Sequence, residues 1–113
     1  MQRIRIETGS KAPAAAGGTV WSTSSTDTRW ANVIVKTVEA QSRYQSIDGV
    51  VDYEFVFRGR PTIALGTTRF VWITDGHPNK LRRYRPAAPP KNVDMHGRWT
   101  SVLVTDTGET ADA

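Results

Sequence analysis

The sequence predicts an all-β fold, either a small antiparallel barrel or a sandwich. Short stretches in which apolar and polar residues alternate recur along the chain, and turns with glycine or proline separate them. Only one segment, residues 39–48, has a helix-favouring composition, and it is short for an independent helix. With 113 residues, 38% apolar and 23% charged, the chain fits one soluble globular domain spanning residues 1–113.

The clearest strand spans residues 51–58. Apolar residues occupy its odd-numbered positions and mostly charged residues its even ones, which is typical of a strand with one face on a core. We expect Tyr53, Phe55 and Phe57 to be buried together on that face. The strand ends at Arg58-Gly59-Arg60-Pro61, because proline has no N–H for a ladder and glycine tolerates turn geometry.

In the N-terminal half, residues 3–7 alternate and predict a short first strand. Residues 8–19 are small and lack periodicity, so they predict a flexible loop or arm. β-branched residues predict a second strand at 30–38. Residues 39–48 are expected to form one helical turn or an extended hairpin tip.

In the C-terminal half, strands are predicted at residues 69–74, 80–85 and 99–105, giving six strands at most. Residues 86–92 read as a stiff, proline-rich linker, because proline is unsuited to a central strand. Residues 106–113 are expected to be a disordered tail. The predicted core comprises Val33, Val35, Tyr53, Phe55, Phe57, Phe70, Trp72, Val102 and Val104.

Several classes of chemistry are disfavoured by what the chain contains. It has no cysteine, which removes disulfides, thiolate nucleophiles and zinc–thiolate sites and suits a cytosolic or virion-borne protein. No apolar run reaches the roughly 18 residues of a membrane helix, and the N-terminus lacks the pattern of a secretory signal. His77 and His96 both lie in turns, without a metal-ligand spacing. We therefore expect neither catalysis nor a cofactor.

The net charge of +4 is unevenly distributed along the chain. Residues 1–54 are neutral overall, residues 55–93 carry +7 and residues 94–113 carry −3. A basic segment of this kind suits contact with phosphate or with an acidic neighbouring subunit. Within it, Arg82, Arg83 and Arg85 surround Tyr84, a pattern compatible with non-specific DNA binding or with subunit contacts. Strand alternation places Arg83 and Arg85 on one face and Arg82 with Tyr84 on the other.

Short motifs follow one another in a fixed order between Arg3 and Val104. They are Gly18-Thr19-Val20-Trp21-Ser22, Trp30-Ala31-Asn32-Val33, Arg43-Tyr44-Gln45, Phe57-Arg58, Arg69-Phe70-Val71-Trp72 and His96-Gly97-Arg98-Trp99. Each motif is weakly specific, and their order and spacing are the informative feature. Together they resemble the head–tail joining, or head-closure, proteins of tailed bacteriophages. The chain departs from that pattern between Thr74 and Asp94, where it carries KLRRYRPAAPPKN.

The resemblance implies a small SH3-like antiparallel β-barrel that forms a homo-oligomeric ring. Such a ring lies in the virion neck, after assembly in the host cytoplasm. It joins the portal or adaptor proteins to the tail tube or tail terminator, and it lines or closes the channel for DNA without reading sequence. Two alternatives remain open: a tail terminator or other neck protein, and a free-standing small-barrel protein that binds nucleic acid non-specifically.

The residues expected to carry such a function fall into two groups. Arg58 and Arg60 lie in a turn between strands and are the candidates for the DNA channel. Candidates for contact with subunits or partners are tryptophan, tyrosine and arginine residues, because these three types are enriched at interfaces. They are Trp21, Trp30, Tyr44, Arg82, Arg83, Arg85 and Trp99.

Overall fold

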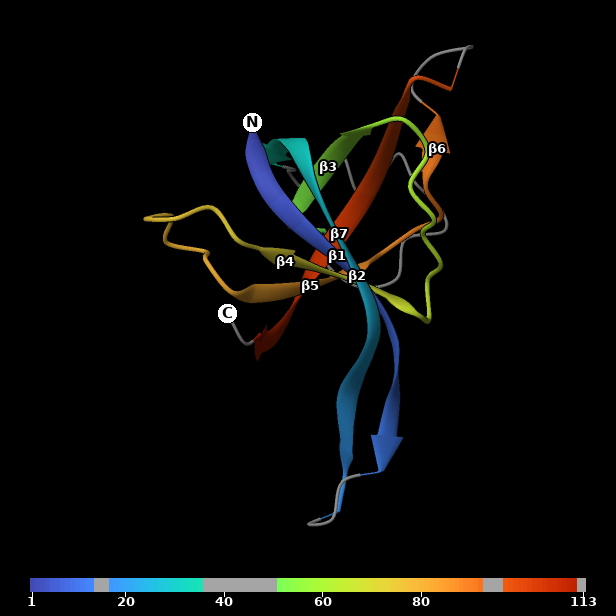
Figure 1. Ribbon diagram of the computed structural model, residues 1–113, viewed down its shortest axis with the longest axis vertical. Helices are drawn as coiled ribbons and strands as arrows, with labels where there is room; N and C mark the ends of the chain where they lie inside the picture. Colours follow the sequence, from blue (N-terminus) through green and yellow to red (C-terminus); the bar gives the residue numbers. More distant parts are fainter. Residues whose placement is uncertain (14–16, 36–50, 93–96, 112–113) are drawn as a thin grey trace.

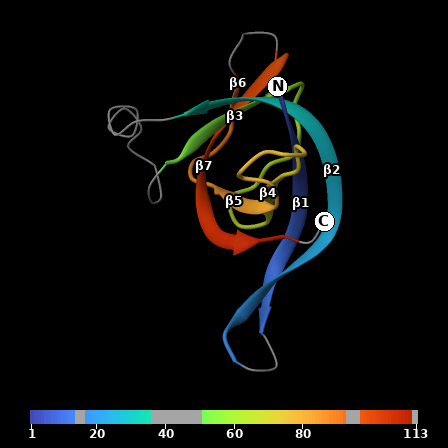
Figure 2. The ribbon, with the colours of Figure 1, turned by 90° about the vertical axis from the view of Figure 1, so that its left-hand side faces the viewer.

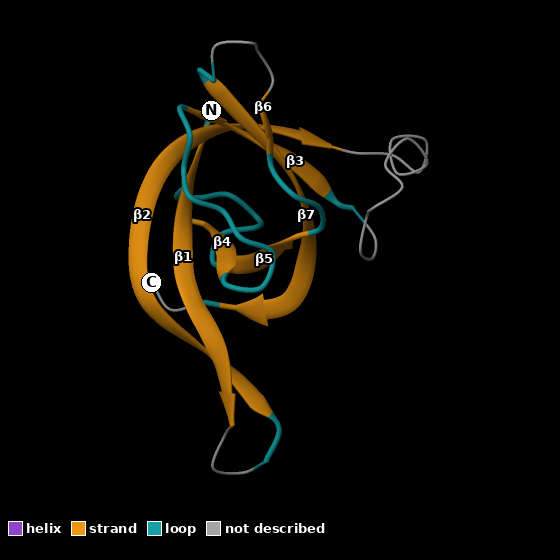
Figure 3. Cartoon of the chain, turned by 90° about the vertical axis from the view of Figure 1, so that its right-hand side faces the viewer, coloured by secondary structure: helices purple, strands orange, loops and turns teal. Residues whose placement is uncertain are grey.

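The computed structural model describes residues 1–13, 17–35, 51–92 and 97–111, and these residues form seven strands. Their bounds are β1 Gln2–Pro13, β2 Thr19–Val35, β3 Tyr53–Arg58, β4 Thr68–Trp72, β5 Arg82–Pro86, β6 Lys91–Asn92 and β7 Trp99–Thr110 (Figure 1). Every paired neighbour is antiparallel. Figure 3 shows strands and loops but no helix in the described part of the chain, which confirms the all-β prediction.

The sheet closes on itself. Its order is β3-β2-β1-β4-β5-β7, with β6 beside β7, and pairing of β3 with β7 completes the ring seen in Figure 2. Closure leaves no long unpaired edge around the barrel wall, so the small barrel avoids the aggregation hazard of an open sheet. Of the two architectures that the sequence left open, the barrel is the one observed.

The core of the barrel is aromatic. Phe55, Phe57 and Phe70 are fully buried, and the remaining buried residues that pack with them are Ile4, Ile6, Ala31, Trp72, Tyr84, Val102 and Val104. Tyr53 shares their face but is only partly buried. Val35 was predicted to lie in the core and is instead 72% exposed. It is the last residue of β2 and pairs with Tyr53 at one end of the barrel. Its side chain is on the same face of the sheet as the core residues, but at this end that position is not enough to bury it.

The first correction concerns residues 8–19, which were predicted to be a flexible loop. Thr8–Pro13 belong to β1 and pair with residues 19–25 of β2, forming a hairpin that projects from the barrel (bottom of Figure 1). A bulge between Thr8 and Gly9 marks the point where the hairpin leaves the barrel, and the Gly9 N–H donates to the Thr67 carbonyl at 2.9 Å. Backbone pairing forms this hairpin although its side chains show no apolar periodicity.

The second correction concerns the C-terminal segment, which was predicted to be a disordered tail from residue 106. β7 instead continues to Thr110, which pairs with Arg82 of β5. Ala111 is buried, and its N–H donates to the Leu81 carbonyl at 2.7 Å. Leu81 has a left-handed φ of 68°, so β5 begins at Arg82 rather than at Lys80 as predicted.

The third correction concerns the proline-rich stretch, residues 86–92. Its ends are strand residues, because Pro86 closes β5 and Lys91–Asn92 form β6. Between them, Ala87 and Ala88 are buried, and Ala87 packs with Val51 and Leu103 in a second apolar cluster. Small alanine side chains allow this close approach, so the stretch covers the barrel wall instead of linking two parts.

The segment 39–48, predicted as a helical turn or hairpin tip, lies outside the described residues, as do Tyr44 and His96. Within the described residues, no helix is long and apolar enough to cross a membrane.

Candidate functional site

Three of the predicted site residues meet in one groove at an end of the barrel. Trp30 on β2, Arg58 at the end of β3 and Trp99 at the start of β7 line a cavity of about 490 Å³, which we call the Trp30–Trp99 groove. Its other lining residues are Met1, Asp27, Arg29 and Gly59. Strand register explains the convergence, because Arg58 pairs with Trp99 and β3 lies between β2 and β7.

The groove combines aromatic side chains with charged ones. Trp30 is 56% exposed, and the Arg3 guanidinium lies 5.8 Å from the centroid of its ring, within range of a cation–π contact. Arg29 pairs with Asp27 at 2.7 Å and donates to the Arg58 carbonyl at 3.3 Å. An exposed tryptophan flanked by arginines suits an apolar or aromatic partner side chain with acidic neighbours.

The turn after β3 is fixed against the start of β7. Gly59 has a φ of 81°, a conformation that glycine adopts without strain, and its carbonyl accepts a hydrogen bond from Thr100 Oγ1 at 2.7 Å. The turn separates the two arginines predicted to face a DNA channel. Arg58 lines the Trp30–Trp99 groove, whereas Arg60 lies against Gly97 and lines a different pocket beside Ile6.

Trp21 lies apart from the other tryptophans. It sits on the hairpin portion of β2, is 8% exposed, and its ring is covered by the Arg69 guanidinium at 4.6 Å from the centroid. Its indole N–H donates to Thr23 Oγ1 at 2.9 Å. In the single chain Trp21 is therefore already packed, and its predicted role in contacts between subunits stays a prediction.

The basic strand β5 is largely compensated by acids from the same chain. Arg82 pairs with Asp106 at 2.9 Å, and this partner raises the pKa of Arg82. Arg83 lies between Glu7 on β1 and Glu109 on β7, at 3.2 and 3.1 Å. The acids are remote in sequence, so the linear charge count missed them. Tyr84 is buried in the core. Arg82, two residues earlier on the same face of β5, is exposed at the start of the strand.

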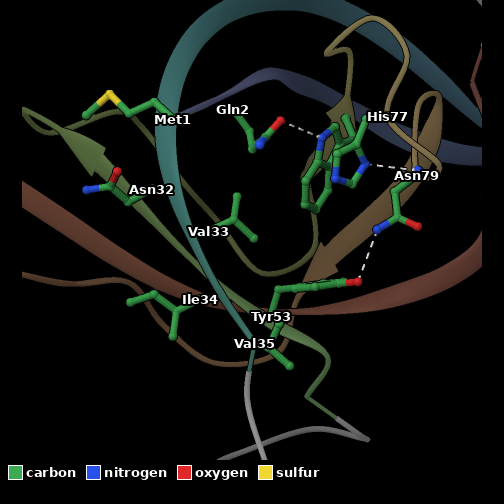
Figure 4. Close-up of a pocket in the computed structure, with 10 residues that line it drawn as sticks. Met1, Gln2, Asn32, Val33, Ile34, Val35, Tyr53, His77 and Asn79 are labelled. Carbon is green, nitrogen blue, oxygen red and sulfur yellow. Dashed lines mark hydrogen bonds between the residues drawn. The ribbon is translucent and has the colours of Figure 1, made fainter.

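The sequence did not predict the pocket drawn in Figure 4, which lies beside the last residues of β2. It has a volume of about 630 Å³. Its lining residues are Met1, Gln2, Asn32, Val33, Ile34, Val35, Tyr53, Trp72, His77 and Asn79. The His77 ring stacks on Trp72 with centroids 4.3 Å apart. The sequence singled out four of its lining residues, Val33, Val35, Tyr53 and Trp72, but predicted them as core, and His77 was predicted only as a turn residue.

The polar groups of this pocket bind one another. Asn79 Nδ2 donates to the Tyr53 hydroxyl at 3.0 Å, and the Asn79 N–H donates to His77 Nδ1 at 3.1 Å (Figure 4). Trp72 Nε1 donates to Gln2 Oε1 at 3.3 Å. The described residues contain no cluster of three His, Cys, Asp or Glu side chains able to hold a metal ion. Exposed Ile34 and Val35 at its rim suit contact with an apolar surface.

No protein family and no curated protein matches this chain in sequence. Among solved structures, the chain is similar to protein SF1141 from Shigella flexneri 2a, a structural genomics target. The TM-score is 0.69 at 22% sequence identity, and the match covers 97% of this chain and 95% of the other. At this identity the likeness concerns the fold, and it extends over nearly the full length of both chains.

Proposed function

We propose that the chain is a structural subunit of the neck of a tailed-phage virion. In this role it forms a homo-oligomeric ring between the portal or adaptor and the tail, joins head to tail, and lines or closes the DNA channel. The order of the sequence motifs supports the proposal, since they resemble head-closure proteins. The motif residues that the structure describes lie along β2, β3 and β4 and at the start of β7, and of these strands β2, β3 and β7 are neighbours in the barrel.

The observation that carries the proposal is that exposed apolar side chains form separate surfaces on a small barrel. Trp30 lies in the Trp30–Trp99 groove, Ile34 and Val35 lie at the rim of the pocket in Figure 4, and Val20 lies on the projecting hairpin. A closed ring of identical subunits uses two different patches for each contact, and stacking between partner rings uses further ones. A chain with several such surfaces suits a subunit with neighbours on several sides.

Contact with DNA in this proposal is electrostatic and non-specific. Arg58 is exposed in the lining of the Trp30–Trp99 groove, and Arg60 is exposed on the same turn. Neither has a carboxylate partner within salt-bridge distance among the described residues. Cations held on a fixed turn attract phosphate whatever the base sequence.

The proposal is tested by disabling the gene in the genome that encodes the chain and counting particles. We expect filled heads and free tails to accumulate without whole virions, and the wild-type gene to restore joining. Arg60→Glu, on the same turn but outside the lining of the Trp30–Trp99 groove, should still join heads to tails but alter retention or passage of DNA. Lys80→Glu is the matched charge control, because Lys80 is exposed outside this turn and should support normal yields. Whole virions at the normal yield without the gene would overturn the proposal.

Two measurements distinguish the proposed function from its two alternatives. A tail terminator or another neck protein would leave heads filled but change tail length or stability, which particle counts and tail measurements report. A free-standing nucleic-acid binder would bind DNA as a monomer, with affinity that falls steeply as salt rises. The pairing of Arg82 and Arg83 with acids of the same chain disfavours that second alternative, because it reduces the positive field of β5.

A further inference from the structure

A second cationic site lies where the hairpin leaves the barrel. Its cavity has a volume of about 200 Å³, and we call it the Arg69 pocket. Its lining residues are Lys11, Trp21, Arg69, Arg85, Thr105, Asp106, Thr107 and Glu109. The three cations come from β1, β4 and β5, so they approach the cavity from different strands.

Arg69 is the unusual member of this pocket, because it is a buried cation. It is 8% exposed, its guanidinium stacks on Trp21, and its NH1 donates to the Thr68 carbonyl at 2.8 Å. Within the described residues no carboxylate lies at salt-bridge distance from it. Burial, and then the positive charge of Arg85, lower the pKa of Arg69. A buried charge without a counter-ion is costly, and a bound anion would offset that cost.

The acids near the pocket are engaged by other arginines. Glu7 is the residue directly opposite Arg69 in the ladder, yet it binds Arg5 and Arg83 at 3.3 and 3.2 Å. Glu109 also binds Arg83, and Asp106 binds Arg82 at 2.9 Å. The pocket lining thus carries three cations against two carboxylates, and each of these carboxylates also binds an arginine outside the lining; the charge of Glu109 opposes the lowering of the Arg69 pKa without reversing it.

We propose that the Arg69 pocket binds a phosphate group, either free phosphate or a phosphate of a DNA backbone. A planar carboxylate is satisfied by one bidentate arginine, whereas a tetrahedral oxyanion directs its oxygens to donors on several sides. Arg69 and Lys11 offer such donors from two strands, and Arg85 adds positive charge from a third. The site is distinct from the turn of Arg58 and Arg60, and it is independent of the proposed role in a virion.

Nuclear magnetic resonance titration of the isotope-labelled full chain tests this site. The probes are inorganic phosphate, an oligothymidylate, and a glutamate peptide. We expect saturable shifts of the Trp21 indole N–H and of the backbone amides at 105–107. Saturation by inorganic phosphate identifies free phosphate as sufficient, whereas saturation by the oligonucleotide alone identifies the DNA backbone. Saturation only by the glutamate peptide, or by no probe, would overturn the proposal.

Variants separate the pocket from general charge effects. Arg69→Gln should weaken binding about tenfold or more, since it removes a charged donor. Lys11 is exposed on the hairpin, so Lys11→Gln leaves the barrel core unchanged. This variant should weaken binding about two- to fivefold. Lys80→Gln makes the same change in net charge away from the pocket and should bind as the wild type does. Equal affinities of the Lys11 and Lys80 variants, or unaltered binding by Arg69→Gln, would exclude the pocket as the site.

Discussion

Phe55 lies at the centre of the aromatic core. It is fully buried, and its ring meets those of Phe70 and Tyr84 edge-on, both with centroids 5.7 Å apart. Such edge-to-face pairs add to the apolar burial that the ring already provides. Because the strands around it form a closed ring, neighbouring side chains have little freedom to collapse into space left by a smaller residue.

Phe55→Ala should therefore lower the free energy of unfolding by about 3–5 kcal/mol. Chemical denaturation followed by circular dichroism measures this difference. Val20→Ala is the control, because Val20 is 51% exposed on the hairpin and its loss should change stability by about 0.5 kcal/mol or less. A loss below about 1 kcal/mol for Phe55→Ala would show that the core tolerates the cavity or is not packed as described.

Tyr84 predicts a pH dependence of stability. Burial is the main cause that raises the pKa of its phenol above the ordinary value of 10.0. In the unfolded chain the phenol ionises near its ordinary pKa, whereas in the folded chain it stays protonated to higher pH. Stability is therefore fully present below about pH 10 and falls above it, by about 1.4 kcal/mol per pH unit for this one group.

Denaturation of the wild type and of Tyr84→Phe between pH 8 and about 11 measures that contribution. The variant lacks the ionisable group but keeps the ring that packs against Phe55. Its stability should fall less steeply above about pH 10 than that of the wild type. Identical slopes for the two proteins would contradict the assignment to Tyr84.

At the scale of elements, the sequence predicted the strands that bury one face. β3 places Phe55 and Phe57 in the core and alternates them with less buried residues, so burial leaves a periodic pattern, whereas β4 is buried along its whole length. The distal part of the hairpin, Thr8–Pro13 with residues 19–25, is exposed over most of its length and carries no such pattern. The same reason explains why residues 106–110 of β7 were missed, since none of them is buried.

The candidate site was predictable only in part. Trp30, Arg58 and Trp99 stand out by residue type, but the register that brings them into one groove depends on pairings between distant strands. The pairing of Arg83 with Glu7 and Glu109 is long-range in the same way, so the linear charge profile overstated how basic β5 is. Residue type therefore identified the candidate residues, but it could not predict which of them the closed sheet brings into contact.

Gly9 tests how the hairpin joins the barrel. A Cβ at this position would collide with the backbone carbonyl of Ser22 on the partner strand, beside the bulge. Gly9→Ala should therefore destabilise by about 1–3 kcal/mol through overpacking. Gly66→Ala is the matched control, since a Cβ there meets nothing within 4 Å and should be neutral or slightly stabilising. Equal denaturation midpoints for both variants would contradict the tight pairing described at the bulge.

At the scale of the whole molecule, charge is arranged to stabilise the closed barrel. Arg83 bridges β1 and β7 by binding Glu7 and Glu109, and Arg82 binds Asp106. A charge reversal at Arg83 would place three carboxylates together and destabilise the fold, so a joining defect in that variant would not identify a contact surface. Assembly is better tested on surfaces that the core does not use, namely the Trp30–Trp99 groove and the hairpin.

The hairpin permits the most direct test of this kind. Replacing residues 12–20 by Asn-Gly would join Lys11 to Trp21, which already pair, through a two-residue turn suited to hairpins. No residue of the main core lies in the removed segment, so we expect the barrel to fold with stability within about 1 kcal/mol of the wild type. Under the proposed function, the shortened chain should fail to join heads to tails, because it lacks the projecting surface.

The matched control keeps the hairpin at full length. Gly17→Asn introduces Asn-Gly at positions 17–18, and asparagine tolerates the left-handed φ of 90° found there better than other non-glycine residues do. Denaturation reports folding of both variants, and counts of heads, tails and virions report joining. If the shortened chain is unfolded, the barrel depends on the hairpin and the two parts are not separable. If it folds and restores virions at the normal yield, the hairpin has no role in joining, and the groove becomes the surface to vary next.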